Sequence, residues 1–207
     1  MKIDLHVHSY ERSGCAISSE KDQIEAAIAK GLGGIALTDH NSQRSKRHID
    51  SLNKKYAPFK IFTGVEIGLG ISGEHLLVLG VPDMKDMCEY RWKYPELHAF
   101  VRERNGYIAM AHPYRYENRV RSNIIDFIPD ALEIRSNNII PRNTSAIISL
   151  ADEIGAKTIA ASDAHVADRV GTYYVELHNM VQTDEELVRE LRSGRYGLGS
   201  SKPRKKI

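Results

Sequence analysis

The sequence has little cysteine, no long apolar run and almost no net charge. Two cysteines, Cys15 and Cys88, in 207 residues are too few for a disulfide framework, so we expect both to be reduced thiols. No apolar run reaches the roughly 18 residues of a membrane span, and the first residues lack the apolar stretch of a signal peptide. These absences predict a cytoplasmic protein with no membrane partner.

The charges nearly balance, with 29 Lys+Arg against 27 Asp+Glu. A dedicated nucleic-acid binder usually carries a large basic excess, so this class is disfavoured, although nucleic acid stays possible as a substrate. At 42% hydrophobic and 27% charged residues, the composition is that of a globular protein. The length predicts one domain over residues 1–207, with a basic tail at 201–207 that we expect to fray.

Short β-branched runs alternate with longer segments of helical period along the whole chain. This alternation predicts repeated β-α units around a parallel sheet. The predicted strands are Lys2–Val7, Gly34–Thr38, Ile61–Ile67, Leu76–Val81, Tyr107–Ala111, Ala131–Ile134, Thr158–Ala161 and Tyr173–Leu177. We favour a closed or nearly closed α/β barrel, and because periodicity does not give strand order, an open sheet stays an alternative. In both architectures, ligands bind at the carboxyl ends of the strands.

Helix boundaries are marked by capping residues. A capping box at Ser19 begins a first helix, which ends at Gly31. Another helix is predicted over Asn143–Glu153. The last helix begins after Thr183, which is followed three residues later by a glutamate, and it ends at Gly194.

Metal-type side chains follow several predicted strands. His6 and His8 have the i, i+2 spacing that places two strand residues on one face, where both could bind one ion. Asp39 and His40 are neighbours, so we expect His40 to be a ligand and Asp39 to orient a ligand. Glu66 interrupts an apolar strand, and a buried carboxylate is costly unless it is paired or metal-bound. Ordinary polar or edge positions are the alternative for each of these residues taken singly.

Four more candidates complete the set: His75, His112, Asp163 and His165. Each could be a structural residue, but so many together favour a polynuclear metal site. Imidazole and carboxylate ligands without a cysteine pair suit Zn, Mn or Fe, whereas Mg prefers oxygen. The remaining histidines are interpreted as structural: His48, His98 and His178.

The ordered set of motifs resembles the PHP (polymerase and histidinol phosphatase) domain family. The resemblance spans residues 2 to about 172. It rests on Asp4-Leu5-His6-Val7-His8-Ser9, Thr38-Asp39-His40-Asn41, Gly64-Val65-Glu66, His75, Ala111-His112-Pro113 and Ser162-Asp163-Ala164-His165. It implies a distorted, TIM-like (β/α)7 barrel with a cluster of two or three metal ions at the carboxyl ends of the strands.

The same resemblance implies how the ligands are shared. One ion would use His6, His8, Glu66 and Asp163, and a second would use Glu66, His75 and His112. A third would use His40 and His165 with an Asp or His that this chain replaces by Ser13. A neutral hydroxyl is a poor substitute, so we expect two firmly held ions; Glu11 or Cys15 could compensate, but solvated and packed roles fit them better.

Two metal ions about 3.5–4 Å apart can activate water and neutralise charge in phosphate-ester hydrolysis. Glu66 would then set their spacing, and His40 and His165 would hold a third ion or act as hydrogen-bond donors or a general acid. Arg115 and Arg135 are the candidate phosphate clamps, because a guanidinium binds two oxygens at once.

The leading hypothesis is a phosphoesterase acting on a small phosphate monoester, such as a nucleotide or an amino-acid-pathway phosphate. The alternatives are a 3′–5′ exonuclease-like phosphodiesterase on single strands, hydrolysis of an amide or lactone, and a noncatalytic RNA-binding scaffold. The flanking tyrosines Tyr114 and Tyr116 could stack on a base or pack on their own loop. Arg119 and Arg169 are weaker phosphate-binding candidates.

Overall fold

The computed structural model describes residues 1–70, 73–84 and 91–201. The predicted tail therefore lies outside the described residues except for Ser201. The strands are β1 (Lys2–Val7), β2 (Gly34–Leu37), β3 (Lys60–Gly68), β4 (His75–Leu79), β5 (Tyr107–Ala111), β6 (Ala131–Arg135), β7 (Lys157–Ala160), β8 (Tyr173–Leu177) and β9 (Tyr196–Ser200). The helices are α1 (Glu20–Ala29), α2 (Lys46–Lys55), α3 (Tyr94–Glu103), α4 (Thr144–Ile154) and α5 (Asp184–Ser193).

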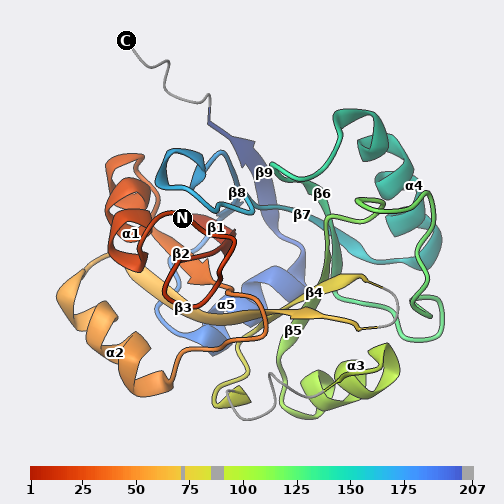
Figure 1. Cartoon of the computed structure of the whole chain (residues 1–207), viewed down its shortest axis with the longest axis horizontal. Coiled ribbons are helices and arrows are strands. Elements are labelled where there is room, and N and C mark those ends of the chain that lie inside the picture. The colour runs from red at the N-terminus through yellow and green to blue at the C-terminus, as the bar shows by residue number, and fades with distance from the viewer. Residues whose placement is uncertain (71–72, 85–90, 202–207) are drawn as a thin grey trace.

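The strands form one sheet in the order β7-β6-β5-β4-β3-β2-β1-β8-β9. This sheet curls into a nearly closed barrel. Its two edge strands meet where the Tyr196 hydroxyl of β9 donates to the Thr158 carbonyl of β7 at 3.1 Å. Figure 1 shows α1 and α2 on one side of the barrel and α3 and α4 on the other. The predicted α/β barrel is confirmed. No described helix is long and apolar enough to cross a bilayer.

The count of seven β/α units is not confirmed, because the barrel is not built from such units throughout. β3 and β4 form an antiparallel hairpin, and β4 also pairs antiparallel with β5. β8 is antiparallel to β1, and β9, which the sequence analysis did not predict, is antiparallel to β8. Gly197 and Gly199 weaken the strand pattern there, since glycine is depleted in strand interiors.

The predicted helix boundaries agree with the capping residues. Ser19 and Asp22 form the predicted capping box of α1, and the Thr183 hydroxyl caps α5. Gly155 and Gly194 end α4 and α5 with φ of 73° and 72°, a left-handed conformation that glycine adopts without steric cost.

The alternation of side chains along the strands separates the barrel interior from the outer layer. Phe62, Leu77, Tyr107 and Ala131 lie in an interior core, which α5 closes with Leu187 and its neighbours. Residues of the opposite parity pack outward against α3 and α4. Because every second side chain of a strand points to the same face, the inward-pointing side chains of each strand extend to the end of the barrel, and one such end is called the mouth below. Glu66 of β3, His75 of β4 and Glu133 of β6 are the interior-facing residues nearest that mouth.

Candidate metal centre

The two histidines of β1 are aimed into the mouth by an irregularity in that strand. The pairing register of β1 with β2 shifts between Asp4 and Val7. Ile3 and Leu5 face the interior core, and Val7 packs in the outer layer with α1 and α2. His6 and His8 both contact carboxylates of the mouth. A local bulge of this kind re-aims side chains next to a functional site.

The segment after β7 brings Asp163 and His165 to the same place. The amide of His8 donates to the Ala164 carbonyl at 2.9 Å, and the amide of Ala164 donates to the His6 carbonyl at 3.1 Å. Asp163 has a φ of 52° and His112 a φ of 28°. Such positive values cost about 1–3 kcal/mol in residues with a side chain, and they cluster at functional sites.

Four buried side-chain atoms meet at the centre of the mouth. The Nε2 atoms of His6 and His8 lie 3.3 and 3.2 Å from Glu66 Oε2, and the same distances separate them from Asp163 Oδ1. An ion about 2.0–2.1 Å from four tetrahedral ligands needs ligand atoms about 3.3–3.4 Å apart. These four imidazole–carboxylate distances therefore match the ligand spacing of a tetrahedral metal site.

These four atoms are also without a hydrogen-bond partner among the described residues. Buried polar atoms are nearly always paired, and a buried carboxylate without a partner is especially costly. A metal ligand needs no hydrogen bond at the atom that binds the ion, so four such atoms together indicate a ligand set. The donor set of this chain thus fits a divalent ion.

The other oxygen of Glu66 faces a second pair of histidines. Glu66 Oε1 is 2.8 Å from His75 Nδ1 and 3.0 Å from His112 Nε2. His75 begins β4, but because β4 runs antiparallel, its first residue lies at the same mouth as the ends of β3 and β5. Glu66 therefore touches both ligand groups with one carboxylate, in the position of a bridge.

His40 and His165 lie at the outer side of this cluster and are partly exposed. The His40 and His165 rings stack on the His8 ring with centroid distances of 4.5 and 4.4 Å. His40 Nδ1 lies 2.9 Å from Glu66 Oε2. His8, His40 and His165 could together hold an ion, and so could His40, Glu66 and His75.

The charges in the cluster shift the pKa values of its members strongly. Burial alone would lower the pKa of His6, but the carboxylates of Asp163, Glu66 and Glu133 outweigh burial and raise it. Burial alone would raise the pKa of Glu66, but the His6 charge and hydrogen bonds from His112 and His40 lower it well below its usual range. Burial and the neighbouring His8 lower the pKa of His165. Such shifts are typical of functional sites.

Asp39 does not join the ligand atoms. Its carboxylate accepts hydrogen bonds from the Ser9 amide at 2.7 Å and the Ser13 hydroxyl at 2.8 Å, and it forms a buried ion pair with Arg44. Ser13, in turn, lies 3.3 Å from His8 Nδ1. The Asp39 carboxylate is thus linked to His8, a candidate ligand, through Ser13.

Two residues of the site escaped the sequence analysis. Glu133 Oε1 lies 3.1 Å from His6 Nδ1, and its other oxygen accepts from the His112 amide at 2.8 Å. Glu133 interrupts an apolar strand as Glu66 does, so the same signal could have found it. Arg44, the buried partner of Asp39, follows a loop with no distinguishing pattern.

The two predicted phosphate clamps are placed differently. Arg115 Nη1 lies 3.4 Å from His112 Nε2 and 3.9 Å from Asp163 Oδ2. Arg135 is exposed at the end of β6. Arg119 pairs with Glu117 on the surface. Arg115 is therefore the arginine that the structure brings to the candidate metal centre.

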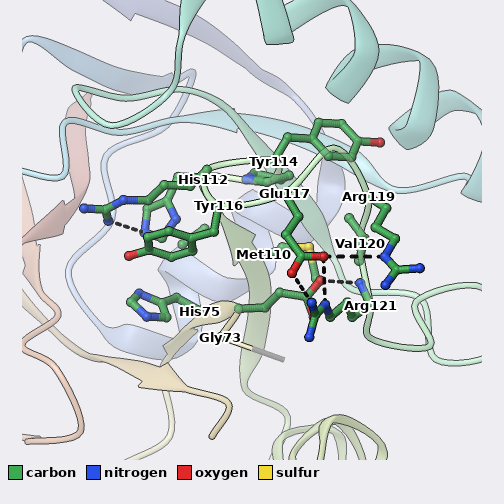
Figure 2. Close-up of a pocket in the computed structure, with 14 residues that line it drawn as sticks. Gly73, His75, Met110, His112, Tyr114, Tyr116, Glu117, Arg119, Val120 and Arg121 are labelled. Carbon is green, nitrogen blue, oxygen red and sulfur yellow. Dashed lines mark hydrogen bonds and ion pairs between the residues drawn. The ribbon is translucent and has the colours of Figure 1, made fainter. Parts of the chain in front are cut away.

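A small pocket opens beside His75 and His112. Figure 2 shows the ring of Tyr116 above His75 and the side chain of Glu117 reaching the guanidinium groups of Arg119 and Arg121. The Tyr116 and His75 rings are 6.2 Å apart, and the Arg115 guanidinium lies 5.1 Å from the Tyr116 ring centre. This pocket gives a substrate an aromatic wall next to the metal ligands.

Comparisons with known proteins agree with this geometry. The family model of the PHP domain matches residues 4–136, and the model of the PHP-associated region matches residues 142–196. Among curated proteins, the DNA polymerase/3′-5′ exonuclease PolX of Bacillus subtilis is 32% identical over 82 residues. That match covers 33% of this chain and only 14% of PolX.

Two solved structures share the fold. A two-domain protein of Bacteroides vulgatus that contains a predicted PHP-like metal-dependent phosphoesterase has a TM-score of 0.73 at 13% identity, covering 97% of this chain and 64% of that one. The lesion-specific endonuclease PfuEndoQ of Pyrococcus furiosus has a TM-score of 0.69 at 17% identity, covering 95% of this chain and 57% of that one. With its family model matched over residues 4–136, the chain belongs to the PHP domain family.

Proposed function

We propose that this protein hydrolyses a phosphate monoester of a small molecule with two divalent metal ions, each Zn, Mn or Fe. The observation that carries the proposal is the group of four buried, unpartnered atoms of His6, His8, Glu66 and Asp163, in which each imidazole nitrogen lies 3.2–3.3 Å from each carboxylate oxygen. Imidazole and carboxylate ligands of this kind suit these metals better than Mg. We also propose that the protein acts in the cytoplasm.

The residues divide into two ligand groups that Glu66 joins. His6, His8, Asp163 and Glu66 Oε2 would hold the first ion, and His75, His112 and Glu66 Oε1 the second. When bound, such a pair lowers the pKa of water and neutralises phosphoryl charge. Glu66 would keep the spacing of the two ions constant, since one of its oxygens would bind each ion.

His165 presents its Nε2 lone pair to the mouth. Its Nδ1 lies 3.1 Å from the Asp163 carbonyl oxygen, and because that oxygen only accepts, Nδ1 carries the hydrogen. The lowered pKa keeps the ring neutral near pH 7. A neutral ring suits a ligand or a proton acceptor better than a general acid, so we assign the role of proton donor to the leaving group to His40.

Arg115 would bind the phosphoryl oxygens from the side of the second ligand group. We expect Arg115→Ala to lower kcat/KM by about 10- to 100-fold, because a hydrogen bond to a charged group contributes about 1.5–3 kcal/mol. Arg115→Lys should recover only part of this loss, since lysine cannot bind two oxygens with one planar group. Steady-state kinetics on the best substrate measures both variants. Arg195→Ala, which removes an exposed arginine after α5, is the control; equal kinetics in all three variants would contradict the clamp.

The experiment that tests the function is phosphate release from a panel of phosphate monoesters and nucleotides. The protein is reconstituted with Mn or Zn and compared with a chelated sample. We expect metal-dependent release from at least one small monoester. Protein that carries metal and releases no phosphate from any monoester would contradict the proposal.

Cleavage of a nucleic-acid strand is the second candidate. Tyr116 and Arg115 lie together beside the ligands, and aromatic rings with arginine are the usual platform for a base and its phosphate. PfuEndoQ and PolX, which share the fold or part of the sequence, act on nucleic acid by their names. Shortened strands from a labelled oligonucleotide, without free phosphate from monoesters, would favour this candidate.

A further inference from the structure

Ser13 stands where the family resemblance implies a metal ligand, yet its contacts are those of a different role. It is buried, and its hydroxyl oxygen is within hydrogen-bond distance of three groups. These are Asp39 Oδ1 at 2.8 Å, the amide nitrogen of His40 at 3.0 Å and His8 Nδ1 at 3.3 Å. We propose that Ser13 is a positioning residue that fixes the ring of His8 for metal binding and is not itself a ligand. The inference rests on the proposed metal site.

The direction of each hydrogen bond follows from what each group can do. A hydroxyl has one hydrogen to donate and two lone pairs to accept with. Asp39 is paired with the Arg44 guanidinium, and its carboxylate only accepts, so the Ser13 hydrogen points to Asp39. The His40 amide only donates, so it occupies one lone pair of Ser13.

One lone pair of Ser13 is then left, and it faces His8. His8 Nδ1 must therefore carry the hydrogen of the ring, which leaves Nε2 with a free lone pair. That Nε2 is one of the four unpartnered atoms of the first ligand group. His6 is fixed in the same way, because its Nδ1 faces Glu133 Oε1 at 3.1 Å. Partners of this kind set which ring nitrogen binds a metal ion.

The ion pair of Arg44 anchors the arrangement. Arg44 is buried, forms ion pairs with both Asp39 and Glu20, and donates to the Ser9 hydroxyl at 2.5 Å. The ion pair with Arg44 therefore fixes the Asp39 carboxylate, and the orientation of this carboxylate fixes the direction of the Ser13 hydrogen. The same bonds use both lone pairs of Ser13, so no lone pair is left for an ion. Ser13 therefore adds no ligand to a third ion.

Metal binding and the state of the His8 ring test the inference without any substrate. We expect wild-type protein to hold two Zn ions per chain after dialysis, measured by elemental analysis. Ser13→Ala should weaken the first ion by about 10- to 100-fold, the usual loss when such a partner is removed, measured by competition with a chromogenic chelator. Ser13→Thr keeps the hydroxyl and should bind as the wild type does. Ser9→Ala, which removes a hydroxyl from the same network without touching a histidine, should also bind normally.

The ring of His8 is read directly in the Zn-loaded wild type by long-range ¹H–¹⁵N NMR. We expect the ring to carry its hydrogen on Nδ1, and a ring without a hydrogen on Nδ1 would overturn the inference even if Ser13→Ala failed to fold. Three ions in the wild type and two in Ser13→Ala would instead make Ser13 a ligand. Two-ion binding in the wild type that weakens in Ser13→Ala, with no phosphate release from any substrate, would leave this inference standing and refute the proposed function.

Discussion

Glu66→Gln abolishes metal-dependent hydrolysis, with an expected loss in kcat of about a thousandfold or more. Glu66 is the residue whose two oxygens face both ligand groups, at 3.2–3.3 Å from His8 and His6 and 2.8–3.0 Å from His75 and His112. A metal ion stabilises a phosphoryl transition state by several kcal/mol. Each 1.36 kcal/mol is a factor of about ten in rate, so misplacing one ion of the pair has an effect of this size.

The amide of glutamine has nearly the shape of the carboxylate, so the packing of β3 is retained. The measurement is phosphate release together with metal content, at saturating Mn or Zn. Glu190→Gln is the matched control, because Glu190 is a buried glutamate of α5 whose partner is Asn179. Full activity in a Glu66→Gln protein that carries both ions would show that Glu66 does not bridge them.

The sequence predicts the metal ligands better than their surroundings. Ligand side chains at strand ends follow from a period of two, and the positions of Glu66 and His112 could be inferred from apolar strands that end in polar residues. The antiparallel hairpin of β3 and β4 could not be inferred from the sequence, because side chains alternate with a period of two in both parallel and antiparallel strands. His75 reaches the mouth only because β4 reverses direction.

The residues that orient the ligands are harder to predict for a physical reason. Asp39, which pairs with Arg44, meets Ser13 between the loops after β1 and β2, and loop conformation has no period. The bulge in β1 likewise depends on pairing with β2, not on its own residues. Ser13 shows the limit most clearly, since its sequence position indicates a lost ligand and only the structure shows its three hydrogen bonds.

We expect removal of the proposed metal ions to lower the melting temperature by about 10 °C or more. An ion present at 100 to 1,000 times its dissociation constant stabilises a protein by about 2.7–4.1 kcal/mol. For a chain of 150–250 residues, each kcal/mol shifts the midpoint by about 2–4 °C, and two ions add their effects. The chelated protein must also keep four buried ligand atoms without partners.

The stabilisation by metal also depends on pH, and the pKa shifts show in which direction it changes. The pKa of His6 is raised in the folded, metal-free protein, so its contribution to stability is complete below about pH 6.5 and disappears as pH rises through the folded value. Burial raises the pKa of Asp4 to about 6, so the ionisation of this residue costs stability mainly between about pH 3.8 and pH 6 and adds little above that range. Glu66 and Asp163, whose pKa values are lowered, lose their contributions only on acidification.

We therefore expect the metal-free protein to become less stable between pH 6 and pH 8.5, and the gain from added Zn or Mn to grow over the same range. Competition between protons and the metal for the histidines acts in the same direction. Differential scanning calorimetry with and without metal, at both pH values, measures the gain. In Glu66→Gln the stability gained from added metal should be less than half of that in the wild type, because both ligand groups lose an anionic oxygen. A gain that is largest at pH 6, or equal in the variant, would show that the ions bind elsewhere than in the mouth of the barrel.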